Sequence, residues 1–243
     1  MIDKFSIFKD FKRVTAEDLT ILGAPVLEGR AVYNVLKDKI ATLEISIKRL
    51  STLQSYDALC LLKNSIAMPE LLYILRTSSC ANNSLLQQFD MVLKNGLETI
   101  LIVQLSDIQW QQASLPVHMG GLGVRSACML APSALPASDA TTLPLQEAIL
   151  LASAAGADDT AVSNIKTTWS CLANKIEPSD LSKHIRRAWD APVTTAVYNV
   201  LMSTSQSPVD LAMLKAVITP HTGDWLHAPP LTAVGLRLSD EAI

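Results

Sequence analysis

Apolar residues recur at steps of three and four over most of this chain, which is the spacing of one face of an α-helix. The clearest case covers residues 29–53, where the apolar face is formed by Val32, Val35, Leu36, Ile40, Leu43, Ile47 and Leu50. A second helical pattern opens at Ser55. We expect it to stop or kink near Met68, because Pro69 has no backbone N–H to donate. The pattern predicts a mainly α fold, built as a bundle of several helices.

Helical patterns also cover most of the remaining chain. They are predicted at residues 70–77, 85–105, 108–113, 126–135, 144–155, 160–175, 179–188 and 192–203, and again from Ser207. Pro132 and Pro136 are expected to disturb one of these helices. Near the N-terminus, residues 19–26 are predicted to form a short strand broken by Gly23 and Pro25, with little other β structure.

Turn residues and composition divide the chain into four expected segments. Residues 1–28 are extended or irregular, and residues 29–135 form a first helical domain. Residues 136–143, rich in small and turn residues, are the best candidate for a linker. Residues 144–243 then form a second helical region that ends in an irregular tail.

The composition describes a folded chain with an apolar excess. Of its 243 residues, 49% are hydrophobic and only 18% are charged, which excludes a disordered chain. The apolar share also suggests that another protein or a missing domain covers some of the surface. The four cysteines are far apart and form no Cys-x-x-Cys pair. The chain is therefore predicted to be intracellular, in the cytoplasm or nucleus, without a disulfide framework or a zinc knuckle.

The charge is slightly negative overall and unevenly distributed. The net charge is −3, with +1 on residues 1–130 and −4 on residues 131–243. A dedicated nucleic-acid-binding protein normally carries a basic excess, so any contact with phosphates must be local. The densest basic cluster is the run 183–187, Lys-His-Ile-Arg-Arg. Because no aromatic residues are interleaved with it, base stacking is not indicated.

Neither a secretory signal nor a membrane span is predicted. The first residues, Met-Ile-Asp-Lys-Phe, contain no apolar core of a signal sequence. No apolar run reaches the roughly 20 residues that a bilayer-crossing helix needs. We therefore expect no membrane partner.

The most distinctive segment is 114–126, Ser-Leu-Pro-Val-His-Met-Gly-Gly-Leu-Gly-Val-Arg-Ser, with three glycines within four residues. It is accompanied by 22–26 (Leu-Gly-Ala-Pro-Val), 66–76 (Ile-Ala-Met-Pro-Glu-Leu-Leu-Tyr-Ile-Leu-Arg) and 223–228 (Gly-Asp-Trp-Leu-His-Ala). Together these segments resemble the region downstream of the polymerase core in non-LTR retrotransposon reverse transcriptases. The resemblance is spread over most of the chain, and it implies an origin in a transposable element.

In that family, the matching stretch looks like the end of the palm, followed by the helical thumb and the connection. The resemblance therefore implies that residues 1–28 are a remnant of the palm edge and that residues 29–135 are thumb-like. The family's catalytic signature is an aromatic residue, a variable one and two aspartates. Asp158-Asp159 lacks the aromatic residue and is expected to start a solvated helix. We expect no catalytic residue, no polymerase activity from this chain alone and no cofactor, with Mg²⁺ only if an intact catalytic core is joined to it.

A thumb that touches nucleic acid would use basic side chains as partners of the phosphates. The candidate residues are Lys48, Arg49, Arg76, Arg125, Arg186 and Arg187. The expected partner is RNA or an RNA–DNA duplex, contacted through its backbone. The alternative for these residues is an ordinary solvated helix face and, for Arg125, an ion pair with a nearby acid.

Two motifs have competing interpretations. The glycine-rich segment either approaches a phosphate through its backbone N–H groups or is a tight turn that lets two elements pack closely. His221 and His227 flank Asp224 and Trp225, but their spacing matches no standard metal site. No metal site is therefore predicted, and Trp225 is expected to anchor the tail.

For the whole chain, the alternatives are a helical protein-interaction module, including one that binds a missing polymerase core, and a retroelement remnant without function.

Overall fold

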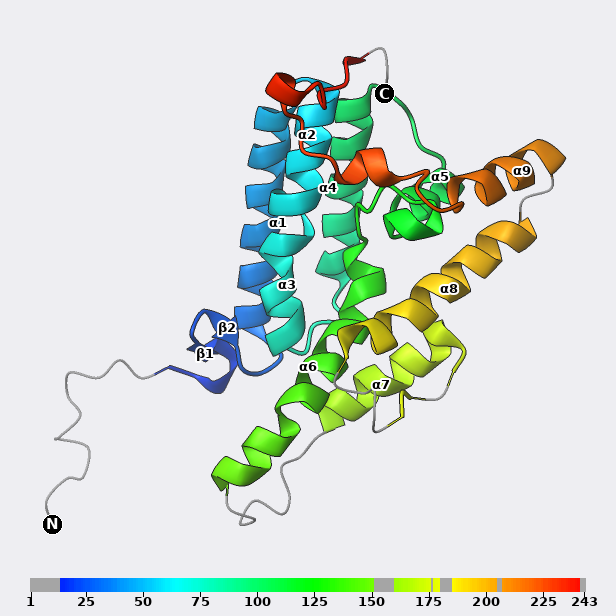
Figure 1. Ribbon diagram of the computed structural model, residues 1–243. Helices are drawn as coiled ribbons and strands as arrows, with labels where there is room; N and C mark the ends of the chain where they lie inside the picture. Colours follow the sequence, from blue (N-terminus) through cyan, green and yellow to red (C-terminus); the bar gives the residue numbers. More distant parts are fainter. Residues whose placement is uncertain (1–13, 151–159, 176, 180–184, 205–206, 241–243) are drawn as a thin grey trace, which may run out of the picture.

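Helices dominate the structure, and the mainly α prediction is confirmed. The computed structural model describes residues 14–150, 160–175, 177–179, 185–204 and 207–240 (Figure 1). The helices are α1 (Arg30–Leu50), α2 (Ser55–Leu61), α3 (Met68–Thr77), α4 (Ser84–Leu101), α5 (Asp107–Ala113), α6 (Ala127–Leu150), α7 (Thr160–Ala173), α8 (Arg186–Thr204) and α9 (Pro208–Val217). The aspartate pair at 158–159 and residues 183–184 of the basic run lie outside the described residues.

A small hairpin replaces the broken strand predicted at 19–26. Strands β1 (Thr20–Ile21) and β2 (Ala24–Pro25) pair antiparallel. The two residues between them, Leu22 and Gly23, have φ angles of 51° and 81°, which suit a two-residue hairpin turn. The hairpin is fixed to the end of α3, because the Ser78 hydroxyl donates a 2.8 Å hydrogen bond to the Pro25 carbonyl.

The main body is formed by α1, the α2–α3 segment and α4, which stand side by side (Figure 1). Helices α1 and α4 approach closely at Gly96, where a Cβ atom would collide with the side chain of Ile47. The kink predicted before Pro69 is present as a π-helical turn, Leu62–Ile66, between α2 and α3. A π-turn is a common way to bend a helix, and here it lets both halves bury leucines in one core.

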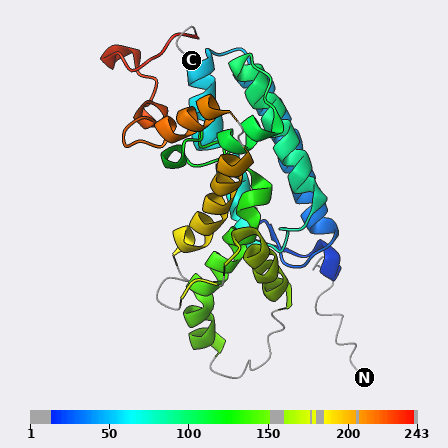
Figure 2. The same ribbon diagram turned by 90° about the vertical axis from the view of Figure 1, so that its right-hand side faces the viewer.

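Helix α6 shows that the linker predicted at residues 136–143 was wrong. Residues 136–143, proposed as a linker, are helical, and the helix continues past Pro132, Pro136 and Pro144. Each proline removes one backbone hydrogen bond, but α6 packs against α3 and α4 on one part and against α7 and α8 on another (Figures 1 and 2). Its small buried residues allow this close packing. The division of the chain into domains stays a prediction.

Helix α8 is also longer than expected. The helix predicted at 192–203 begins earlier, at Arg186, ends at Thr204 and contains Pro192. Residues 180–184 of the separate helix predicted at 179–188 lie outside the described residues. Helix α8 is fixed against α7 by two tryptophans, Trp169 and Trp189, whose ring centroids are 5.0 Å apart in an edge-to-face arrangement. The Trp169 Nε1–H donates a 2.7 Å hydrogen bond to the Trp189 carbonyl. These rings form the centre of a second, smaller core.

The C-terminal tail returns to the main body and lies along α2 (Figure 1). The Tyr56 hydroxyl is 2.7 Å from the carbonyl oxygens of both Trp225 and Ala228, and the Tyr56 and Trp225 rings are 6.1 Å apart. Farther along, Arg237 forms a 2.5 Å ion pair with Asp57. The expectation that Trp225 anchors the tail agrees with these contacts.

One described helix, Ser55–Thr77, is long and apolar enough to cross a bilayer, judged by length and composition alone. The sequence analysis had predicted no such run. In the structure this segment contains the π-turn and contributes Leu59, Leu62 and Leu71 to the main core. Core helices of globular proteins pass the same test, so the expected lack of a membrane partner stays a prediction.

Candidate nucleic-acid interface

The glycine-rich segment is a tight turn whose backbone groups bond within the protein. The N–H of Gly121 donates to the Pro116 carbonyl (3.2 Å), and the N–H of Gly123 donates to the Leu115 carbonyl (3.0 Å). A Cβ atom on Gly121 would lie less than 3.0 Å from the Leu115 carbonyl oxygen. The N–H groups needed for a phosphate cradle are therefore engaged, and the geometry favours the tight-turn interpretation.

The N-terminus of α6, which follows this turn, already holds an anion of the protein itself. One oxygen of Asp90 accepts a 2.6 Å hydrogen bond from the Ala127 N–H. The other accepts from the Ser126 hydroxyl (2.6 Å) and from the Cys128 N–H (3.1 Å). A carboxylate at a helix N-terminus satisfies free N–H groups and is stabilised by the helix dipole. Asp90 thus occupies the position that a phosphate could take, a role the sequence analysis did not identify.

Arg125, a candidate phosphate contact, is engaged in an ion pair. Its two terminal nitrogens donate to the two carboxylate oxygens of Asp190 at 2.8 and 2.6 Å. Both side chains are only 15% exposed. Of the two interpretations of Arg125, the geometry favours the ion pair, because the guanidinium faces a carboxylate of α8 instead of solvent. Its effect on the interface is indirect, since it fixes α8 against the glycine turn.

Arg76 and Arg186 meet at one cleft, although they are 110 positions apart in the sequence. Arg76 is in the last turn of α3 and Arg186 is the first residue of α8. The cleft encloses about 210 Å³, and small residues of α6, Ala134, Ala137 and Ser138, form most of the rest of its lining. Within the described residues, neither guanidinium has a hydrogen bond or an ion pair. We call this feature the basic cleft.

The other candidate residues lie elsewhere or only beside the cleft. Lys48 and Arg49 are exposed in the last turn of α1, at the opposite end of the main body from the end of α3 (Figure 1). Arg187 is exposed and directly follows Arg186 in the first turn of α8. The structure therefore brings together two of the six candidates, Arg76 and Arg186, with Arg187 adjacent.

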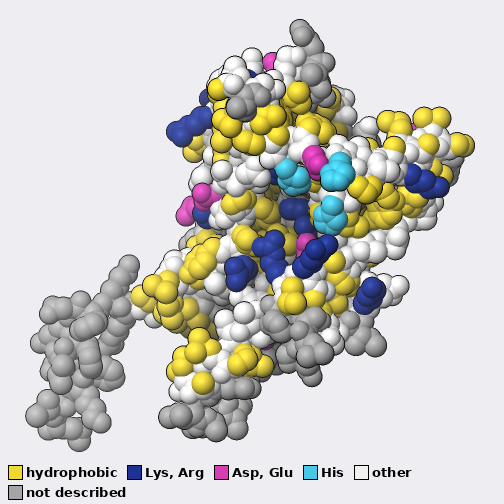
Figure 3. Space-filling view, in the orientation of Figure 1, with side chains coloured by type: hydrophobic (Ala, Val, Ile, Leu, Met, Phe, Trp, Pro, Cys, Tyr) yellow, Lys and Arg dark blue, Asp and Glu magenta, His cyan; other side chains and the backbone are white. Residues whose placement is uncertain are grey.

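Basic and histidine side chains gather on one face of the molecule, which Figure 3 shows directly. Lys63, from the π-turn, donates to the Leu226 carbonyl, and burial lowers the pKa of its ammonium group. His118, His221 and His227 line a small pocket of about 120 Å³ next to that contact. Sequence reasoning did not connect these residues, because His118 lies more than 100 positions from the others.

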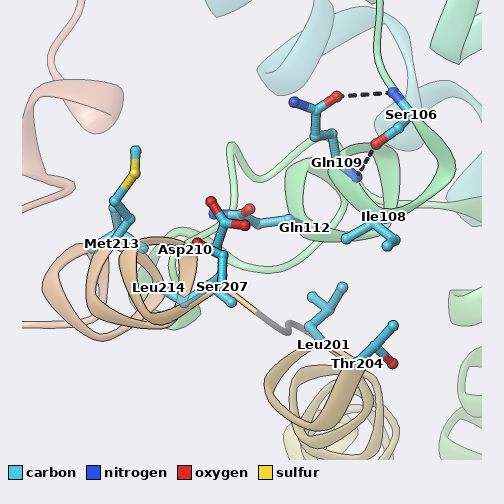
Figure 4. Close-up of a pocket in the computed structure, with 11 residues that line it drawn as sticks. Ser106, Ile108, Gln109, Gln112, Leu201, Thr204, Ser207, Asp210, Met213 and Leu214 are labelled. Atoms are coloured by element: carbon cyan, nitrogen blue, oxygen red, sulfur yellow. Dashed lines mark hydrogen bonds between the residues drawn. The ribbon is translucent and has the colours of Figure 1, made fainter.

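A larger cavity has a different chemistry. It is an open cleft of about 630 Å³ between α5, the end of α8 and α9 (Figure 4). Its lining is a mixture of apolar and uncharged polar side chains, and Asp210 is its charged member. Ser106 and Gln109, at one side, are engaged in a capping box at the start of α5. A cleft of this kind does not suit a phosphate, but its apolar rim suits another protein surface.

Among the described residues, no group of three or more His, Cys, Asp or Glu side chains is arranged to hold a metal ion. Comparisons of the chain with protein-family models, with curated proteins and with solved structures give no match.

Proposed function

We propose that this chain is a helical module that contacts the backbone of RNA or an RNA–DNA duplex through the basic cleft, without polymerase activity of its own. The proposal joins the sequence resemblance to the thumb and connection of non-LTR reverse transcriptases with one structural observation. Arg76 and Arg186, two of the predicted contact residues, face the same cleft from different helices. An intracellular location and the lack of a metal cofactor remain part of the prediction.

The chemistry of the cleft supports a phosphate ligand. A guanidinium group presents a planar set of N–H donors that matches phosphate oxygens, and two such groups can hold one backbone segment from both sides. The floor of small α6 side chains, Ala134 and Ala137, allows a sugar–phosphate chain to approach closely. Neither arginine must first break an ion pair with a described residue before it binds.

The same lining argues for backbone contact without sequence readout. Aromatic side chains, on which unpaired bases stack, are not among the described residues that line the cleft. Phosphate contacts position a protein on nucleic acid but carry no sequence information. We therefore expect similar affinity for duplexes of different sequence, and strong dependence on salt because each phosphate contact releases counterions.

The test is the binding of a fluorescent RNA–DNA duplex to the full chain across a salt series. The double variant Arg76→Gln/Arg186→Gln is expected to weaken binding and to reduce the slope of log affinity against log salt by about 0.7–0.9 per lost contact. The matched control is Lys48→Gln/Arg49→Gln, which removes the same charge at the other end of the main body. Equal loss in both variants, or no binding at low salt, would contradict the proposal.

The protein-interaction alternative is favoured by a separate observation. Ile108 and Met213 are large apolar side chains that line the 630 Å³ cleft, and both are exposed (Figure 4). Exposed apolar clusters of this kind commonly mark surfaces where proteins associate. Light scattering separates the two functions, since association through this cleft would be weakened by mild detergent and not by salt.

A further inference from the structure

The pocket lined by His118, His221 and His227 is built from two distant parts of the chain. His118 lies in the 3-10 turn Val117–Met119, directly before the glycine turn. Of the other two histidines, His227 ends the short turn Asp224–His227 of the tail and His221 lies three residues before that turn. The two parts are held in contact at Gly223, where a Cβ atom would collide with the side chain of Val117.

All three imidazoles are exposed, and they lie on a face that also carries lysine and arginine side chains (Figure 3). We propose that this histidine pocket is a second phosphate-binding site, which extends the path of a nucleic-acid backbone beyond the basic cleft. The inference rests on the proposed function, and it adds a property that the cleft alone does not have. Binding through this pocket strengthens as the pH falls.

The charges around the pocket determine which histidines contribute. Its titratable lining consists of the three histidines and Asp224, contributed by the turn at 117–119, the end of α9 with the following loop, and the turn at 224–227. The Nδ1 atom of His221 lies 2.9 Å from a carboxylate oxygen of Asp224. His221 is therefore paired with that carboxylate, whereas among the described residues neither His118 nor His227 has an ion pair.

Lys63 adds a cationic side chain beside the pocket. Its ammonium donates to the Leu226 carbonyl, one residue before His227, and its stem packs next to Gly123. The lysine thus places a cation beside the three imidazoles. Free imidazole side chains take up a proton near pH 6.5, and the charged ring donates hydrogen bonds to phosphate oxygens from both nitrogens.

The experiment measures duplex affinity of the full chain at pH 8 and pH 6 at constant salt. Wild type is expected to bind roughly fivefold to tenfold more tightly at pH 6, with a salt slope steeper by about 0.7–0.9 for each added contact. His118→Gln/His227→Gln should lose most of this gain. Asp224→Asn should bind more tightly than wild type at both pH values, because a negative charge leaves the pocket.

The controls separate this inference from the proposed function. Arg76→Gln/Arg186→Gln should weaken duplex binding at both pH values. The ratio of the affinity at pH 6 to that at pH 8 should stay as in the wild type. If the ratio of duplex affinity at pH 6 to that at pH 8 is unchanged in His118→Gln/His227→Gln, the histidine pocket is refuted, whereas the basic cleft is not. No duplex binding at any pH would overturn both.

In a further arm, inorganic phosphate alone is titrated at pH 6 while imidazole NMR resonances are followed. Saturation by phosphate, without a pH effect on the duplex, would overturn nucleic acid as the source of the phosphate.

Discussion

Arg125 and Asp190 join the glycine turn to α8 through two hydrogen bonds of 2.8 and 2.6 Å. The residues lie 65 positions apart, and Asp190 is one turn along α8 from Arg186. The pair therefore sets where α8 begins relative to α6, and with it the position of Arg186 at the basic cleft.

Removal of Arg125 is expected to be costly, because it leaves the largely buried carboxylate of Asp190 without its partner. Arg125→Ala should lower the free energy of unfolding by about 2–4 kcal/mol, measured by urea denaturation. As a control, Lys94→Ala breaks an ion pair with Asp107, whose side chain is 94% exposed, and should cost about 1 kcal/mol or less. Similar losses in the two variants would show that the Arg125 pair does not stabilise the fold.

Gly121 is expected to accept no side chain, because its neighbours are backbone atoms that cannot move away. Gly121→Ala should destabilise the protein by about 3 kcal/mol or more. The comparison is Gly23→Ala, where φ is +81° and nothing lies within 4 Å of a Cβ, so only backbone strain of about 1–2 kcal/mol is added. Thermal unfolding of both variants shows which substitution destabilises the protein more. A smaller destabilisation by Gly121→Ala than by Gly23→Ala would contradict the tight-turn geometry.

The cysteines should differ in reactivity. Burial, reinforced by Glu28, raises the pKa of Cys80 to about 12, and burial together with Asp90 raises the pKa of Cys128 to about 12. At pH 8 iodoacetamide should modify the exposed Cys171 first and leave these two thiols unmodified until the protein unfolds, as mass spectrometry can show.

The same pKa shifts predict a loss of stability in alkaline solution. In the unfolded chain both thiols ionise near the ordinary value of 9.0, whereas in the folded protein they stay neutral up to about 12. Below pH 9 the thiols are neutral in both states, and their full contribution to the free energy of unfolding is present. This free energy should fall between pH 9 and 12, where only the unfolded chain loses the protons. Cys80→Ala/Cys128→Ala should show a shallower fall. Identical slopes would contradict the assignment.

The apolar cleft is tested by a charge placed on its rim. Met213→Glu should reduce any self-association seen by sedimentation, while it changes the free energy of unfolding by only about 0.5 kcal/mol because the side chain is exposed. Met91 on α4 has the same exposure of 62% but lies outside the cleft, so Met91→Glu is the matched control. Equal behaviour of the two variants would argue against a docking surface at the cleft.

Local patterns predicted the helices well, because apolar spacing and capping residues act over a few positions. The pattern at 29–53 became α1, and the predicted break before Pro69 became the π-turn. The expected disturbance at Pro132 and Pro136 was overestimated. Packing of α6 against four other helices compensates for the missing hydrogen bonds, and the sequence near the prolines does not reveal this packing.

The candidate site was predictable only in part, because its geometry depends on residues that are distant along the chain. Basic residues can be recognised one by one, but nothing in the spacing of Arg76 and Arg186 indicates that they share a cleft. The carboxylate that engages Arg125, and the return of the tail that brings His227 near Lys63, are likewise tertiary relationships.

Helix α6 contributes Ala131 and Ala134 to the main core and Ala137 to the tryptophan core of α7 and α8. One helix thus belongs to both cores, so we expect unfolding of either core to unfold part of α6 and to remove support from the other core. Heating should accordingly produce one cooperative calorimetric transition, and a substitution that destabilises either core should lower the temperature of that single transition.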